Sequence, residues 1–362
     1  MQFDVEARSI YITKHGSQAY GLATPTSDLD IKGVCIEPTA YHLGYLNHFE
    51  QQERLAAKGH PADSVIYSLK KFAKLAAECN PNIIEVLHVS DSCIITCDNA
   101  GDRLRAHKDD FISKKAMHTF SGYAFSQMKR IKSHRSWLLN GPKHKPTRAE
   151  FGLNENPDMP TGQLKAAQAA VAKKLQHWNF ENMDGLDPDL RILIQGTIAE
   201  LFAEAELSSD SLYLAAARNI GISENFLELL DKERKYNNAV TNGNQYQNWA
   251  ATRNPARAAM EAESSYDRKH ASHAIRLSRM CCEILEGKGV IVDRHIAGDA
   301  EELLAIKAQG IWTYDQVITE VEALNLKAQD LYKTSKLPHS PNRTKLDELV
   351  VSITEEYLSI YG

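Results

Sequence analysis

The sequence lacks any long apolar run. No stretch approaches the ~18 apolar residues of a membrane-spanning helix, and the first ten residues, MQFDVEARSI, carry acids where a signal peptide has a basic and then an apolar stretch. The six cysteines are scattered, without the paired spacing of a zinc finger. We therefore expect a protein of the reducing cytoplasm that has no membrane partner.

An excess of positive charge is also missing. With 42 basic and 47 acidic residues, the formal net charge is −5, so any nucleic-acid surface would have to be local. The composition, 43% hydrophobic and 25% charged, argues against a disordered or fibrous protein. The length of 362 residues allows one large domain or two ordinary ones, each with its own core.

One segment, residues 129–148, does concentrate positive charge and contains no acid. Its seven basic residues are Lys129, Arg130, Lys132, Arg135, Lys143, Lys145 and Arg148. Such clustering is typical of a surface that binds phosphate groups, but a solvated helix end followed by a loop explains the charge equally well. Trp137 and Trp249 could stack on bases, although an isolated tryptophan more often belongs to a core.

Apolar periodicity divides the chain into an α/β part and a helical part. Apolar residues alternate around 10–12 and 29–31, and a strand over 63–67 runs into a helix that Ser68 could cap. We expect residues 236–249, which are rich in asparagine, to form a long loop. The predicted fold class is α+β, with one domain over 1–110 and a mostly helical domain over 111–362. Helices are expected over 114–139, 161–178, 188–206, 211–219, 223–235, 254–287, 300–307, 314–332 and a last segment ending at 361.

The stretch HGSQAYGLATPTSDLDIKGV, residues 15–34, holds the clearest chemistry. Asp28 and Asp30 are two residues apart, so on a strand they point to the same face, with Leu29 turned to the core. Paired carboxylates repel each other, and a hard divalent cation such as Mg²⁺ relieves this. Gly16 and Ser17 follow a strand and could bring backbone N–H groups close to a phosphate. A turn after Pro25 is the alternative interpretation of the aspartates.

These residues resemble a known family. Gly16-Ser17, ten intervening residues and Asp28-Leu29-Asp30-Ile31 are similar to the signature of the DNA-polymerase-β-like nucleotidyltransferase superfamily, with His15 in place of its usual hydrophobic residue. The fuller string GSQAYGLATPTSDLDIKGV resembles a bacterial and phage branch of RNA-repair type. Further segments that resemble this branch are DSVIYSLKKFAKLAAECNPNIIEVL, FSGYAFSQMKRI, YDRKHASHAIRLSRMCCEIL and KLPHSPNRTKLDELV. The resemblance implies a five-stranded mixed sheet with helices, followed by a helical domain that helps to hold nucleotide or acceptor.

The resemblance also implies a third carboxylate on a neighbouring strand. We choose Asp63, because it stands at the start of an alternating strand pattern. Glu50, Glu53 and Asp91 are competitors that lack such a context. The alternative role for Asp63 is that of a turn residue at the entry to its strand.

A second segment with chemistry is YDRKHASHAIRLSR. On a helix, Lys269, His273 and Arg276 fall on one side at spacings of four and three, and they are candidate contacts to the phosphates of a nucleotide or acceptor. An exposed charged face with a core histidine is the alternative. Zinc binding by His270 and His273 is disfavoured, because helical ligand pairs favour a spacing of four and no third ligand is evident.

The resemblance implies an enzyme that transfers a nucleoside monophosphate from a nucleoside triphosphate, ATP or CTP, to a hydroxyl without a template. Gly16 and Ser17 would hold the triphosphate. Two Mg²⁺ ions, with Mn²⁺ as an alternative, would be held by Asp28, Asp30 and Asp63.

The acceptor is left open by the motifs. The basic residues Lys129, Arg130, Lys132, Lys143 and Lys145 favour an RNA 3′ end, either tRNA-like or a repair intermediate. Adenylylation of a protein hydroxyl and a non-catalytic nucleotide or RNA sensor are the alternatives. The large helical domain argues against the first of these, and the intact Asp28, Asp30 and Gly16-Ser17 argue against the second. Whether a repair partner is needed is left open as well.

Overall fold

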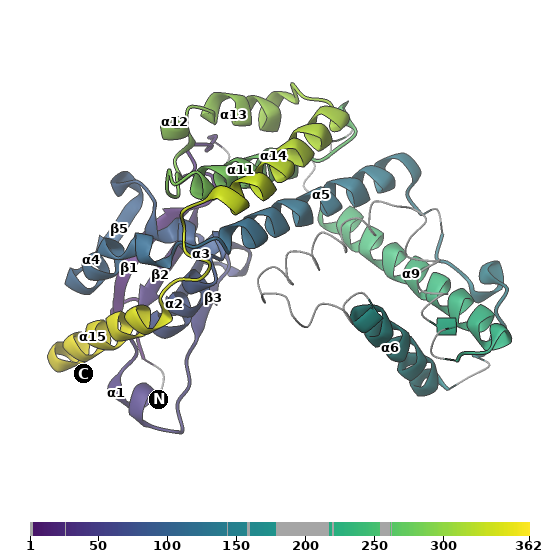
Figure 1. The fold of residues 1–362 in the computed structure, drawn as a ribbon, viewed down its shortest axis with the longest axis horizontal. Coiled ribbons are helices and arrows are strands. Elements are labelled where there is room, and N and C mark those ends of the chain that lie inside the picture. The colour runs from purple at the N-terminus through teal and green to yellow at the C-terminus, as the bar shows by residue number, and fades with distance from the viewer. Residues whose placement is uncertain are drawn as a thin grey trace. The chain divides into compact units, whose positions relative to one another are not determined.

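The structure, a computed structural model, describes residues 3–25, 27–142, 144–157, 160–178, 217–218, 221–253, 261 and 263–362. The chain divides into two compact units (Figure 1): unit 1 comprises Met1–Arg135 and Met260–Gly362, and unit 2 comprises Ser136–Ala259. This division differs from the predicted boundary at 110, because the C-terminal helices fold back into the unit that holds the sheet. A prediction that follows chain order cannot anticipate that return.

Unit 1 is built on a five-stranded mixed sheet in the order β3-β4-β2-β1-β5. β1 is antiparallel to both β2 and β5, whereas β4 is parallel to β2 and antiparallel to β3. A mixed sheet with helices is the predicted α+β architecture. The strands are β1 (Ser9–His15), β2 (Asp30–Cys35), β3 (Gln51–Arg54), β4 (Asp63–Ser68) and β5 (Ile94–Cys97).

The local predictions for the first strands are confirmed with one exception. β4 covers the predicted strand, and the Ser68 side chain caps the next helix by accepting a hydrogen bond from the N–H of Lys71 at 3.2 Å. Leu29, however, is 38% exposed. The prediction that it faces the core was wrong, because β2 begins only at Asp30 and Leu29 still belongs to the preceding irregular segment.

Helices supply the rest of the described fold of unit 1. α11 packs against α13 and α14, and α15 packs against α2 and α4, as can be followed in Figure 1. Among the described residues, no helix combines the length and the apolar character that crossing a membrane would need. The helices of this unit are α1 (Thr39–Leu43), α2 (Leu69–Ala77), α3 (Pro81–Leu87), α4 (Asn99–Ala106), α5 (Ala116–Asn140, which continues into unit 2), α11 (Arg268–Leu285), α12 (Arg294–Ala297), α13 (Ala300–Gln309), α14 (Tyr314–Thr334) and α15 (Arg343–Tyr361).

Unit 2 contains the largest error in the predicted secondary structure. Its described helices are α6 (Thr161–Trp178) and α9 (Glu224–Thr252), and α9 runs straight through the predicted loop 236–249. Tyr246 and Trp249 pack against Trp137 with ring centroids 6.1 and 5.4 Å away, and the Trp137 indole N–H donates to Asn242. These contacts outweigh the low helix propensity of the asparagines and the glycine.

Three other helix predictions have different outcomes. The predicted helices 188–206 and 211–219 lie outside the described residues, apart from 217–218. The single helix predicted over 254–287 is interrupted in its described part. Ser265 has a φ of 64°, and α11 begins only after the capping residue Asp267. A serine in the left-handed region cannot continue a helix, so the chain changes direction just before α11.

Candidate active site

The turn after β1 brings the backbone against a carboxylate. Gly16 has a φ of 62°, and a Cβ added there would lie 2.2 Å from Asp30 Oδ2. Glycine suits this position because it adopts a positive φ without strain and has no Cβ to collide with the Asp30 carboxylate. The Tyr20 N–H donates to the Gly16 carbonyl at 3.1 Å and the Leu22 N–H donates to the Ser17 carbonyl at 2.9 Å, which makes the turn compact. Of the two predicted cradle residues, Gly16 therefore lies directly beside Asp30.

The three predicted carboxylates meet at one corner of the sheet. Asp30 is the first residue of β2 and Asp63 the first of β4, and the two are register partners in the parallel ladder. Partners on adjacent strands, ~4.8 Å apart, point to the same face. Asp28 is exposed and lies two residues before Asp30. We refer to Asp28, Asp30, Asp63 and Gly16 as the carboxylate site.

The electrostatics of Asp30 reflect this crowding. Burial is the main cause that raises the pKa of its carboxyl; Lys269 opposes the rise, whereas the charges of Asp63 and Asp28 add to it. A divalent cation would relieve the repulsion, and carboxylate oxygens are the ligands that Mg²⁺ prefers. The donor set at this corner therefore fits the predicted ion.

Asp63 is better placed than its competitors. Its Oδ1 accepts a hydrogen bond from the N–H of Ala56 at 2.7 Å, so it also has the turn role considered as the alternative. Glu50 and Asp91 are each paired with a basic side chain at 2.6 and 2.8 Å. Glu53 lies on the edge strand β3, opposite Val65 and not opposite Asp30. The charge of Asp63 raises the pKa of the Asp30 carboxyl.

Lys32 is a charged neighbour that the sequence reasoning missed. It follows Asp30 by two residues on β2, so both point to the same face. Its ammonium donates to the Asn82 carbonyl of α3 at 2.8 Å, and burial lowers its pKa to about 8, against the opposing effects of Glu85 and Asp30. The alternation of Asp28, Asp30 and Lys32 in the sequence is the signal that could have revealed it.

A buried ion pair lies near the turn of Gly16. Arg276 and Glu85 are each 1% exposed, and an Arg276 nitrogen lies 2.7 Å from Glu85 Oε1. The guanidinium carbon of Arg276 stands 3.6 Å from the centroid of the Tyr20 ring, and the Tyr20 hydroxyl donates to Glu85 Oε2 at 2.7 Å. The pair thus joins α3 to α11. His15, 4% exposed, lies 3.7 Å from the Glu85 carboxylate.

This environment changes the interpretation of the three helical candidates. Arg276, predicted as a phosphate contact, is buried and engaged by Glu85, which favours a structural role. Spacing along a helix could not show which side faces the core. His273 is held neutral: burial first, and then the charge of Arg276, places its pKa well below the usual value. Lys269 is exposed and lowers the pKa of Asp30. Of the three residues, Lys269 is the one whose charge faces the carboxylate site.

The predicted RNA-binding residues divide between the two units. Lys129, Arg130 and Lys132 are exposed on the part of α5 in unit 1. Arg130 contributes to lowering the pKa of His273, so its charge lies on the side of α5 that is near α11. Arg135 donates to the Ser265 carbonyl at 3.4 Å. Lys143 lies outside the described residues.

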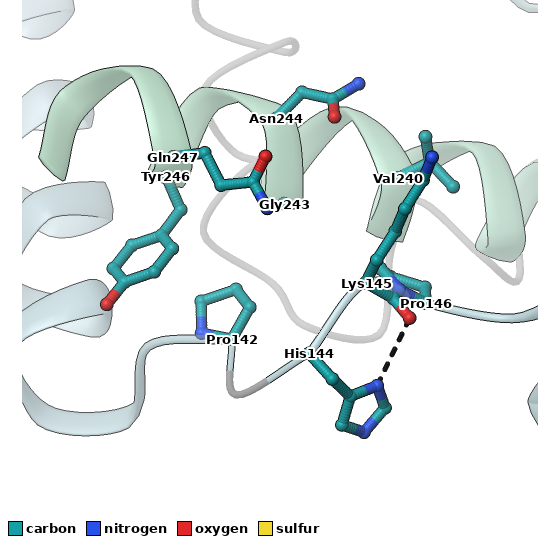
Figure 2. A pocket seen from close by; sticks show the side chains of 9 residues that line it. All are labelled: Pro142, His144, Lys145, Pro146, Val240, Gly243, Asn244, Tyr246 and Gln247. Carbon is teal, nitrogen blue, oxygen red and sulfur yellow. Dashed lines mark hydrogen bonds between the residues drawn. The ribbon is translucent and has the colours of Figure 1, made fainter. Parts of the chain in front are cut away.

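In unit 2, Lys145 is exposed at the rim of a small pocket between the 142–146 segment and α9 (Figure 2). The pocket has a volume of about 60 Å³. Sites for small-molecule ligands have roughly 300–1,000 Å³, so this pocket is too small for a nucleotide. Arg148 is engaged by the Glu233 carboxylate at 2.5 and 3.0 Å. Of the predicted basic residues in this unit, Lys145 is the described one that is exposed.

Comparison with known proteins identifies the region that holds the carboxylate site. The model of a family described as RNA repair pathway DNA polymerase beta family matches residues 2–140. Residues 2–140 of this chain are therefore similar to that family. The predicted superfamily and its RNA-repair branch are thereby confirmed. The matched region includes Gly16, Asp28, Asp30 and Asp63, whereas Lys269, His273 and Arg276 lie beyond it.

A stretch of 88 residues is 31% identical to part of a protein from Enterobacteria phage T4, described as an uncharacterized 38.9 kDa protein in the nrdC-mobD intergenic region. It covers 23% of this chain and 26% of the phage protein, so the match spans about a quarter of that relative. No solved structure matches the chain.

Proposed function

We propose that the chain is a Mg²⁺-dependent, template-independent nucleotidyltransferase that moves a nucleoside monophosphate from a nucleoside triphosphate to a hydroxyl at an RNA 3′ end. The observation that carries the proposal is the register pairing of Asp30 with Asp63, beside Asp28 and under the backbone of Gly16. Three carboxylates next to a turn that only glycine can make form a site suited to metal-bound phosphates.

Each residue of the site has a defined part in this proposal. Asp28, Asp30 and Asp63 would hold two Mg²⁺ ions, with Mn²⁺ as an alternative. When bound, such ions stabilise charge on the entering and leaving oxygens of a phosphoryl group. Ser17 and the turn at Gly16 would bind the triphosphate of ATP or CTP, and Lys269 would neutralise part of its charge.

The RNA acceptor rests on the cations that extend from this site. Lys269 acts on Asp30, and both Lys269 and Arg130 act on His273, so positive charge continues from the carboxylate site to α5. Lys129 and Lys132 are exposed on the same helix. A row of exposed basic residues leading to a reactive site suits a polyanion that must present its end there.

Incubation with Mg²⁺, each labelled nucleoside triphosphate in turn, total RNA and cell lysate tests the reaction. We expect label to enter RNA and the labelling to disappear with Asp28→Ala. Label that enters protein in place of RNA would support adenylylation of a side chain. If the wild type labels nothing while Asp28→Ala binds nucleotide equally well, the protein is a sensor and the proposal fails.

Binding of RNA is tested separately by varying the salt concentration. Changing Lys129, Arg130 and Lys132 together to alanine should weaken RNA binding and reduce the slope of log affinity against log salt by about two to three, since each released phosphate contact contributes ~0.7–0.9. Lys145→Ala, with or without Lys143→Ala, reports on unit 2 in the same assay. An unchanged slope in the triple variant would show that α5 is not part of the RNA surface.

A further inference from the structure

A group of metal-ligand side chains outside the carboxylate site joins two helices of unit 1. It consists of His134 near the end of α5, Asp267, which caps α11, and His270 in the first turn of α11. One ligand atom from each residue lies within 4.8 Å of the other two. We propose that these three residues bind a divalent ion of the zinc class, with a fourth coordination position left to a non-protein ligand. This inference does not depend on the proposed nucleotidyl transfer.

The distances favour metal ligation over hydrogen bonding. Asp267 Oδ2 lies 3.6 Å from His134 Nδ1 and 3.5 Å from His270 Nε2. Both distances exceed the ~3.2 Å limit of a good hydrogen bond. In a tetrahedral zinc site, with metal–ligand bonds of ~2.0–2.2 Å, neighbouring ligand atoms are about 3.3–3.5 Å apart. The two observed distances are close to that tetrahedral edge.

The carboxylate of the group is fixed in place. Asp267 is 1% exposed, and its Oδ1 accepts a hydrogen bond from the N–H of His270 at 3.1 Å as the cap of α11. The cap therefore orients one oxygen toward the helix and leaves Oδ2 facing both imidazoles. A carboxylate oxygen held between two imidazoles is a donor arrangement typical of a zinc-class ion.

The neighbouring arginines are directed to other groups. Arg268 pairs with Glu263 at 2.8 Å and donates to the Ala308 carbonyl. Arg135 stands over the Tyr314 ring at 4.5 Å. An ion at the group would connect α5 to the start of α11. Lys269, whose charge reaches the carboxylate site, lies between two of the ligands in sequence.

Cobalt substitution gives a direct test on the full-length protein. After removal of metals with a chelator, Co²⁺ is titrated into the Asp28→Asn, Asp30→Asn protein, in which the carboxylate site is weakened, while visible absorption is recorded. We expect one equivalent of Co²⁺ to give the intense absorption of tetrahedral coordination and Zn²⁺ to displace it. Weak absorption of octahedral type, or none, overturns the proposal.

Three variants in the same background assign the ligands. His134→Ala and Asp267→Asn should each lower the Co²⁺ affinity at least tenfold. Asparagine is itself a good helix cap, so Asp267→Asn removes the ligand charge while keeping α11 capped, and circular dichroism checks that it is folded. His273→Ala, one turn further along α11, is the matched control and should bind Co²⁺ like the parent. Full affinity in Asp267→Asn would overturn the assignment.

Discussion

The carboxylate site and the pair Glu85–Arg276 use charge in opposite ways. At the carboxylate site, three like charges are gathered where β2 and β4 begin. Asp28 and Asp63 are exposed there, and the charge of Lys269 on α11 acts on Asp30. At the second, one carboxylate and one guanidinium are each 1% exposed and bind each other at 2.7 Å. An excess of like charge indicates a site suited to an external ligand, whereas a closely matched ion pair indicates a structural connection. Of two cations on the same helix, Lys269 acts on the carboxylate site and Arg276 belongs to the buried pair.

The largest effect is expected from a substitution in the carboxylate site that lowers activity and leaves the fold stable. Asp30→Asn should reduce nucleotidyl transfer by at least about 10²-fold, because a misplaced reacting group alone costs that much. The free energy of unfolding should stay the same or rise, since one of three repelling charges is lost. Activity and urea unfolding measured on the same preparation test both statements. Glu53→Gln, which changes an exposed carboxylate on the edge strand, is the control and should leave activity intact.

The opposite pattern is expected for the buried pair. Arg276→Met leaves Glu85 as an unpaired buried charge and should lower the free energy of unfolding by about 3–5 kcal/mol. Adding Glu85→Gln should restore part of that loss, because the buried charge disappears. Lys269→Met, on the same helix, is the matched control: its unfolding should be unchanged, while its KM for nucleoside triphosphate should rise. If Arg276→Met and Lys269→Met had the same free energy of unfolding, the structural role assigned to Arg276 would be contradicted.

The smallest effect concerns the histidine beside the pair. Burial, with the charges of Lys32 and Arg276, keeps the pKa of His15 well below its usual value. Below a pH of about 6.5 the unfolded chain therefore binds a proton at this residue that the folded chain does not, and stability falls as the pH falls. The His15→Phe variant should lose stability less steeply between pH 7.5 and 5.5, by up to about 1.4 kcal/mol per pH unit. Urea unfolding at three pH values measures the slope, and an unchanged slope would contradict the expectation. His273, whose pKa is lowered in the same direction, should leave a residual dependence.

Those features of the site that depend on neighbours in the sequence could be predicted. The motif of Gly16-Ser17 followed by Asp28 and Asp30 lies within one short stretch, although β2 begins only at Asp30 and strand alternation does not extend to Asp28. Asp63 was chosen from its local strand pattern, and the register places it opposite Asp30. Lys32 had the same kind of signal, an alternation on β2, and was missed.

Features that depend on packing partners far away in the sequence could not be predicted. Trp137 stabilises a helix through the asparagine-rich segment 236–249, which has a poor propensity for it. Glu85 lies far from Arg276 in the sequence, so no spacing indicated that the arginine is already paired. His134 is likewise remote from His270 in the sequence, so no local spacing indicated that their ring centroids lie 5.8 Å apart.

The sequence by itself determined the α+β class, the nucleotidyltransferase-like motif and the residues at the start of β2, because these depend on periodicity and short spacings. Only the tertiary structure decided which charges face outward. The C-terminal helices return to the sheet, so α11 presents Lys269 to Asp30 and buries Arg276 against Glu85. Burial is a property of the whole packing arrangement, and it sets whether a charged side chain is available to a ligand or already engaged within the fold.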